Sequence, residues 1–134
     1  MTHSRSPWRI RFIILFGLLA VLTGCNYRQG WVEVTYSDRT QATYSLFNGQ
    51  KEQVINLAAG EGLTLAYDLA IAKGSLTLQI VDPNRTVVWE GSFTETSTGD
   101  TSFTVANEGV YRLVISGNRT RGSFDLHWEI TEND

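Results

Sequence analysis

The alternation of apolar and polar residues after residue 30 is the strongest constraint on how this chain folds. Near the C-terminus, Phe124, Leu126, Trp128 and Ile130 alternate with polar residues, which gives one apolar face and one polar face. A period of two is typical of a β-strand with one buried face. After residue 30 the sequence shows no useful stretch with the 3.6-residue period of a helix, so we expect an all-β domain.

Similar runs recur along the chain, and turn-forming residues separate them. The pairs Asn48-Gly49 and Lys73-Gly74 and the glycine-containing segment 117–122 are each expected to reverse the chain between two strands. Eight or nine short strands predict an antiparallel β-sandwich of jelly-roll type, because two sheets must cover each other's apolar faces. The predicted strands are 31–36, 41–47, 51–57, 62–71, 74–81, 86–93, 101–105, 109–116 and 122–130.

The predicted strand 109–116 differs from the others because both of its faces are apolar. Tyr111, Leu113 and Ile115 form one face, and Val110 and Val114 lie on the other. We therefore expect a central strand, or one that is partly covered on its second face.

The first 24 residues have the pattern of a secretory signal peptide. Three arginines, Arg5, Arg9 and Arg11, accompany the continuous apolar run 12–22. This run is shorter than the roughly 20 residues that a membrane-spanning helix needs. We interpret residues 1–24 as a cleaved signal.

The segment Leu22-Thr23-Gly24-Cys25 resembles the lipobox of bacterial lipoproteins. The resemblance implies cleavage between Gly24 and Cys25, and attachment of a diacylglyceryl group to the Cys25 thiol, sometimes with further acylation by a fatty acid such as palmitate. Two buried acyl chains hold a protein durably on a membrane, whereas one chain binds only marginally. We expect an extracytoplasmic protein anchored by lipid to the cell membrane or the outer membrane.

These features divide the chain into three parts. Residues 1–24 are the predicted signal, residues 25–30 the lipidated cysteine with a short tether, and residues 31–134 the β-sandwich. Five extended residues reach at most about 18 Å, so the domain is expected to lie near the lipid surface.

The charge of the part after residue 24 disfavours nucleic acid as a partner. No acidic residue precedes Cys25 and three of the 11 basic residues do, so 8 basic and 14 acidic side chains remain, with a formal charge of −6. A surface of this sign repels phosphate backbones. The single cysteine excludes an intramolecular disulfide, so the core alone must hold the domain together.

The stretch from about Lys51 to Ile130 resembles the bacterial pre-peptidase C-terminal domain, a small β-sandwich of secreted proteins. Three segments carry the resemblance. They are 57–65, with its glycine turn; 78–88, with Asp-Pro between two strands; and 108–126, with a Gly-x-Tyr strand and a closing strand. The acidic Asp-x-Asp-Leu element of that family is replaced here by Lys73-Gly74-Ser75-Leu76, so no metal role is carried over.

The sequence predicts no catalytic site, no metal site and no cofactor. His127 is the only histidine after residue 24 and lies on the polar face of its strand, where a solvent-facing role is expected. Zinc sites need three or four ligands of the Cys, His or carboxylate type. The loop candidates for calcium are Asp82, Asn84 and Asp100, and turn formation explains them better.

Two tryptophans, Trp31 and Trp89, are the candidate ligand contacts. Exposed tryptophan stacks on sugar rings or anchors a protein partner, although core packing is the more common role of large aromatics in a small β-domain. For Trp31 a position against lipid headgroups is a third option.

The predicted function is a non-enzymatic envelope module that binds a protein or a glycan. The alternatives are a structural envelope lipoprotein without a discrete ligand, and an inhibitor of a cell-wall hydrolase. The inhibitor role needs a protruding loop, for which 94–100 is the candidate.

Overall fold

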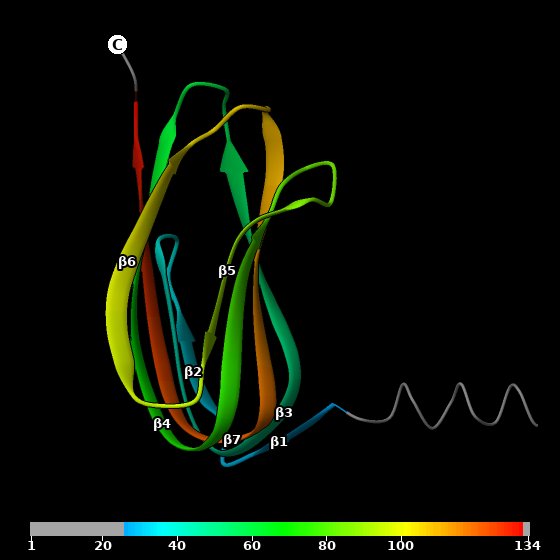
Figure 1. Cartoon of the computed structure of the whole chain (residues 1–134), viewed down its shortest axis with the longest axis vertical. Helices are drawn as coiled ribbons and strands as arrows, with labels where there is room; N and C mark the ends of the chain where they lie inside the picture. Colours follow the sequence, from blue (N-terminus) through cyan, green and yellow to red (C-terminus); the bar gives the residue numbers. More distant parts are fainter. Residues whose placement is uncertain (1–25, 133–134) are drawn as a thin grey trace, which may run out of the picture.

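Seven antiparallel strands make up the part of the chain that the computed structural model describes, residues 26–132 (Figure 1). Within this part no helix is long and apolar enough to cross a membrane. The predicted signal peptide and the lipobox cysteine lie outside the described residues. The strands are β1 (Tyr27–Gln29), β2 (Val32–Thr35), β3 (Arg39–Leu57), β4 (Gly62–Val81), β5 (Val87–Phe93), β6 (Ser97–Thr104) and β7 (Gly109–Thr131).

The strands form one sheet that bends over on itself into two layers, which confirms the predicted antiparallel sandwich. The order along the sheet is β1-β3-β7-β4-β5, with β2 also paired to β3 and β6 also paired to β4. β7 is central, because β3 pairs with one of its edges and β4 with the other along nearly its whole length. We call the layer with β2 and β6 the first layer, and the layer with β5 the second layer.

Three predicted turns are wrong, and each is instead a bend within one long strand. Asn48-Gly49 lies within β3, Lys73-Gly74 within β4, and 117–122 within β7. Register shifts interrupt the β3–β7 ladder between Tyr44 and Gly49, and the β4–β7 ladder between Ile71 and Ser75, at matching positions. Six of the predicted strands therefore merge into three, and their bends together form one end of the sandwich, which we call the corner (Figure 1).

Two glycines make this bend possible, because the strands approach too closely for a side chain. A Cβ atom on Gly74 would lie 2.3 Å from the carbonyl oxygen of Arg119, and one on Gly122 would lie 1.8 Å from that of Ala70. Both glycines also have positive φ, 75° for Gly74 and 146° for Gly122. Glycine adopts such angles without the steric penalty of other residues.

The core lies between the two layers, where the predicted apolar faces meet. Phe124, Leu126 and Trp128 of β7 are buried, as their alternation predicts. Fully burying a leucine or phenylalanine side chain contributes about 1.5–3 kcal/mol. On the outward face of the second layer Val114 is also buried, with 7% of its surface exposed, as expected for a central strand with a covered second face.

The predicted tether, residues 25–30, needs correction, because Tyr27–Gln29 forms β1. This strand pairs with Leu46, Phe47 and Asn48 of β3, at the corner. The Arg28 guanidinium lies 4.4 Å from the centroid of the Trp31 ring, a cation–π contact that holds β1 against the domain. The sequence 26–30 carries no apolar alternation, so only its pairing partner reveals it as a strand.

The predicted 94–100 loop is also mostly strand. β6 begins at Ser97, and Thr98 and Asp100 pair with Asp68 and Ala66 of β4. The predicted loop is thereby shortened to the β5–β6 connection, residues 94–96. The predicted turn at Asp82, by contrast, is confirmed: its Oδ1 accepts hydrogen bonds from the backbone N–H of Asn84 and of Thr86 at 2.9 and 2.8 Å.

The close approach at the corner predicts unequal effects of two glycine substitutions. Gly60 has a φ of 88°, similar to that of Gly74, but a Cβ there meets nothing within 4 Å. Gly60→Ala is expected to lower the free energy of unfolding by about 1 kcal/mol, from backbone strain alone. Gly74→Ala is expected to lower it by about 2–4 kcal/mol, because the strands must also separate. Urea denaturation of both variants measures the difference, and equal losses would contradict the role given to the corner.

Candidate functional site

A group of polar side chains from three strands gathers on the outward face of the first layer. Arg39 and Gln41 come from β3, Asp125 and His127 from β7, and Asp68 from β4. The register places Arg39 beside His127, and Asp125 between Gln41 and Asp68. We call these five residues the outer polar cluster.

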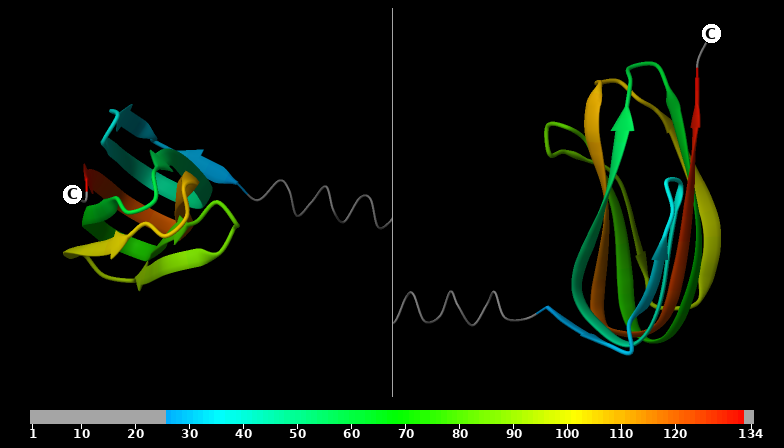
Figure 2. Two further views of the ribbon diagram at one scale, coloured as in Figure 1. Left: turned by 90° about the horizontal axis from the view of Figure 1, so that it is seen from above. Right: turned by 180° about the vertical axis from the view of Figure 1, so that it is seen from behind.

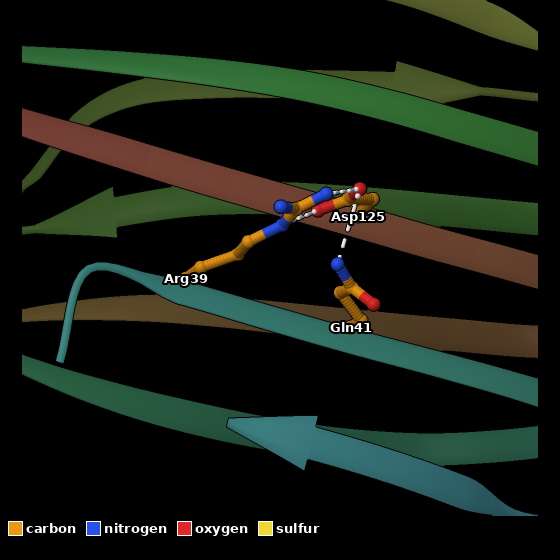
Figure 3. A network of polar contacts seen from close by, with 3 residues as sticks. All are labelled: Arg39, Gln41 and Asp125. Atoms are coloured by element: carbon orange, nitrogen blue, oxygen red, sulfur yellow. Dashed lines mark hydrogen bonds and ion pairs between the residues drawn. The ribbon is translucent and has the colours of Figure 1, made fainter. Parts of the chain in front are cut away.

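The cluster is organised by a two-pronged ion pair between Arg39 and Asp125 (Figure 3). Arg39 Nε donates to Asp125 Oδ1 at 2.8 Å, and Arg39 Nη2 donates to Asp125 Oδ2. This parallel arrangement fixes the plane of both groups, and it is stronger than a hydrogen bond between neutral groups. The two side chains nevertheless keep 43% and 33% of their surface exposed, so they remain available to a ligand.

Gln41 completes the network on the β3 side. Its Nε2 lies 3.5 Å from Asp125 Oδ2, as drawn in Figure 3. With the amide turned over, its oxygen instead accepts from Arg39 Nε and Nη2 at 2.7 and 2.8 Å. The second orientation has the shorter hydrogen bonds, and in either orientation Gln41 braces the ion pair.

The ion pair shifts the titration of Asp125. The hydrogen bonds from Arg39, more than its charge, hold the pKa of Asp125 below its ordinary value of 3.8, against an opposing effect of partial burial. The same hydrogen bonds raise the pKa of Arg39. At neutral pH the pair is therefore fully charged.

The turn between β2 and β3 forms the rim of the cluster. Asp38 Oδ2 lies 3.3 Å from His127 Nε2, and the backbone oxygen of Asp38 accepts a hydrogen bond from the Trp128 N–H at 2.9 Å. Tyr36, whose N–H donates to the Arg39 oxygen at 2.7 Å, keeps 57% of its surface exposed. The rim thus adds an aromatic ring and a carboxylate to the cluster.

A shallow hollow of about 300 Å³ lies at the centre of the cluster. Ala66 pairs with His127 across the β4–β7 ladder, and its small side chain leaves space between the histidine and Asp68. Asp68 pairs directly with Asp125, and like charges in such positions repel. Arg39 offsets only one of the two charges, so the hollow favours a ligand that donates hydrogen bonds. Its lining comprises Arg39, Ala66, Tyr67, Asp68, Asp125 and His127.

The hollow presents charged and polar hydrogen-bonding groups. None of its lining residues is a serine, threonine or cysteine. Across residues 26–132, no three His, Cys, Asp or Glu side chains are grouped so that they could hold a metal ion. The arrangement offers a guanidinium, an imidazole and two carboxylates to a polar ligand.

The two tryptophans that the sequence singled out both lie at the margin of the core. Trp31 stacks on Tyr44 with ring centroids 5.5 Å apart, and it also contacts Phe47 and Phe124. Trp89 lies 6.0 Å from the ring of Tyr67. Both are half-buried, so packing accounts for them, and a ligand contact at either stays a prediction.

The three residues considered as calcium ligands do not come together in space. Asp82 and Asn84 form the turn between β4 and β5, whereas Asp100 lies on β6. His127 is exposed, as the polar face of its strand predicts. Gly24 and Cys25, the predicted cleavage and lipidation residues, lie outside the described residues, so their roles stay predictions.

The sequence did not reveal the outer polar cluster, although each member occupies a polar position in an alternating run. Arg39 and Asp125 are 86 residues apart, and only the register of β3 against β7 brings them together. A sequence signal that would have helped is the pairing of a long cation with an acid at outward positions of two neighbouring strands.

Comparisons with known proteins leave the family open. No protein-family model and no curated protein matches the chain, so the resemblance to the pre-peptidase C-terminal domain stays a prediction. A CBM4 structure is similar over 82% of this chain and 81% of its own, with 11% identity and a TM-score of 0.47. The carbohydrate-binding module CBM6cm-2 of Cellvibrio mixtus lichenase 5A, solved with cellotriose, is similar over 82% and 92%, with 16% identity and a TM-score of 0.45.

A third similar structure is PliG of Aeromonas hydrophila, a periplasmic inhibitor of g-type lysozyme. It is similar over 80% of this chain and 90% of its own, with 10% identity and a TM-score of 0.43. Likenesses this distant carry no inference about what the present chain binds.

The ion pair predicts a pH-dependent effect of Asp125→Asn. Because the pKa of Asp125 is lowered in the folded state, its stabilising contribution is complete above the ordinary value of 3.8 and is lost as the pH falls through the folded-state value. The variant is therefore expected to be less stable than the wild type at neutral pH, and the difference should shrink towards zero in acid. Chemical denaturation over this pH range measures it, with Glu90→Gln as the control for overall charge. A difference that is constant with pH would contradict the ion pair.

Proposed function

We propose that this protein is a lipid-anchored, non-enzymatic binding module of the bacterial cell envelope, and that a glycan binds at its outer polar cluster. The observation that carries the proposal is the cluster itself. Four side chains of the cluster, Arg39, Asp68, Asp125 and His127, come from three strands and line one exposed hollow.

The lipobox at Leu22-Thr23-Gly24-Cys25 supports the anchored part of the proposal. The structure adds that the sheet begins at Tyr27, two residues after the predicted lipidation site. An anchor at Cys25 therefore leaves almost no free chain, and the domain is held directly at the lipid surface.

The composition of the cluster favours a glycan. Sugar hydroxyls both donate and accept hydrogen bonds, which suits a surface that presents carboxylates beside a guanidinium and an imidazole. The uncompensated carboxylate of Asp68 accepts hydrogen bonds without requiring a charged ligand. The exposed ring of Tyr36 at the rim offers a face on which a sugar ring packs.

The fixed geometry of the cluster also favours binding. The bidentate Arg39–Asp125 ion pair and the amide of Gln41 hydrogen-bonded to it fix the side chains of the cluster in position. These side chains lie on strands rather than on loops. A preformed site loses less conformational entropy when a ligand binds.

Titration with defined glycans tests the proposal. Soluble peptidoglycan fragments and oligosaccharides from other envelope polysaccharides are added to isotopically labelled domain, and amide shifts are followed by NMR. We expect shifts to concentrate at 36–41, 66–68 and 125–128. Asp68→Asn is expected to weaken binding by about tenfold, because a hydrogen bond to a charged group is lost. His127→Gln is expected to weaken it by about fivefold, because the hydrogen bond of the imidazole is lost.

Glu90→Gln is the matched control. Glu90 lies on the outward face of the second layer, where it accepts a hydrogen bond from Gln79 at 3.2 Å. Its substitution is expected to leave binding unchanged. Shifts that concentrate on the second layer, or no shifts with any of the glycans, would contradict a glycan site at the cluster.

A further inference from the structure

Basic side chains gather at the corner of the sandwich, next to β1. Lys73, Arg119 and Arg121 line a hollow of about 580 Å³ together with Tyr27 and Gln29 of β1. Arg28, on the same strand, donates to the Gln50 oxygen at 2.9 Å. These four residues are half of the 8 basic residues that follow residue 24.

In the connections at the opposite end of the sandwich, three acidic residues outnumber one basic residue, Arg85. Glu61 lies in the β3–β4 connection, Asp82 in the β4–β5 connection and Glu108 in the β6–β7 connection, all at the end away from the corner (Figure 1). Glu95, in the β5–β6 connection, lies at the corner end but across the sandwich from β1 (Figure 2). The domain is therefore polarised along its long axis, although its overall charge is negative.

The basic end is also the end at which the chain leaves the predicted anchor. Asn26 lies against the corner, because a Cβ on Gly49 would fall 2.2 Å from Asn26 Oδ1. Tyr27, which follows, keeps 50% of its surface exposed. Tyrosine is enriched where proteins meet the headgroup region of a bilayer.

We propose that the corner, with Lys73, Arg119 and Arg121 as its principal contacts, docks on anionic phospholipid headgroups of the bilayer that holds the anchor. This proposal rests on anchoring at Cys25 and goes beyond it, because lipidation alone fixes one point and leaves the domain free to tilt. Attraction at the basic end holds that end on the membrane and orients the long axis away from it. Basic residues are attracted to an anionic membrane surface when they lie within about a Debye length of it. Because only Asn26 separates Cys25 from β1, an anchor at Cys25 keeps the corner within this distance.

Vesicle binding by the unlipidated domain tests the docking separately from the anchor. Residues 26–132 contain every strand and the whole described core, so a chain that begins at Asn26 keeps the packing described above. Its N-terminus is acetylated, so that no new charge is added at the corner. Sedimentation with vesicles of phosphatidylcholine alone, and with vesicles in which about a third of the lipid is phosphatidylglycerol, measures the partition coefficient at low salt.

We expect binding to the anionic vesicles and little to the neutral ones, with a loss of binding as salt is added. The double variant Arg119→Gln/Arg121→Gln is expected to lower the partition coefficient about 25-fold, because each arginine contributes a factor of about five. The matched control is Arg85→Gln with Arg112→Gln, which removes the same charge from positions away from the corner. This control is expected to stay within about twofold of the wild type, since those residues lie beyond the reach of the surface potential.

Three results would overturn the proposal. The first is equal binding to both vesicle types, and the second is an equal loss in the two double variants. The third is absence of vesicle binding while a soluble polyphosphate still binds at Arg119 and Arg121, which would make the corner a site for a soluble polyanion. Each of these leaves lipidation of Cys25 unaffected, so failure of the docking is distinguishable from failure of the anchor.

Discussion

The whole structure depends on the backbone pairing of β7 with β3 and β4 through a common bend. β7 is hydrogen-bonded to β3 on one edge and to β4 on the other, in both layers. The three strands must therefore bend at matching positions, because otherwise the backbone hydrogen bonds between them would break. Gly74 and Gly122 permit the close approach that this requires. The bend turns a single sheet into a sandwich, and it brings the apolar faces of the same three strands against each other to form the core.

The same bend separates the two surfaces to which we assign roles. Outward side chains of the first layer, where β3, β7 and β4 run side by side, form the outer polar cluster. The bend itself carries β1 and the basic residues Lys73, Arg119 and Arg121. A domain that stands on its corner would leave the cluster on its side, exposed to the space outside the membrane.

Sequence alternation predicted the inward faces well but not how the strands connect. Phe124, Leu126 and Trp128 are buried as expected, because burial follows from local periodicity. Asn48-Gly49 failed as a hairpin because a glycine pair permits either a reversal or a bulge, and only pairing with a distant strand decides between them. The outer polar cluster depends in the same way on the register between residues about 86 positions apart, which no local pattern encodes.

Anchoring at Cys25 is the claim on which both the envelope location and the orientation of the domain depend. Intact mass spectrometry of the protein extracted from bacterial membranes tests it most directly, beside a Cys25→Ala variant. We expect a wild-type chain that begins at Cys25 and carries a diacylglyceryl group, and a variant that carries no lipid. A wild-type chain that begins at another residue and has no lipid would contradict it.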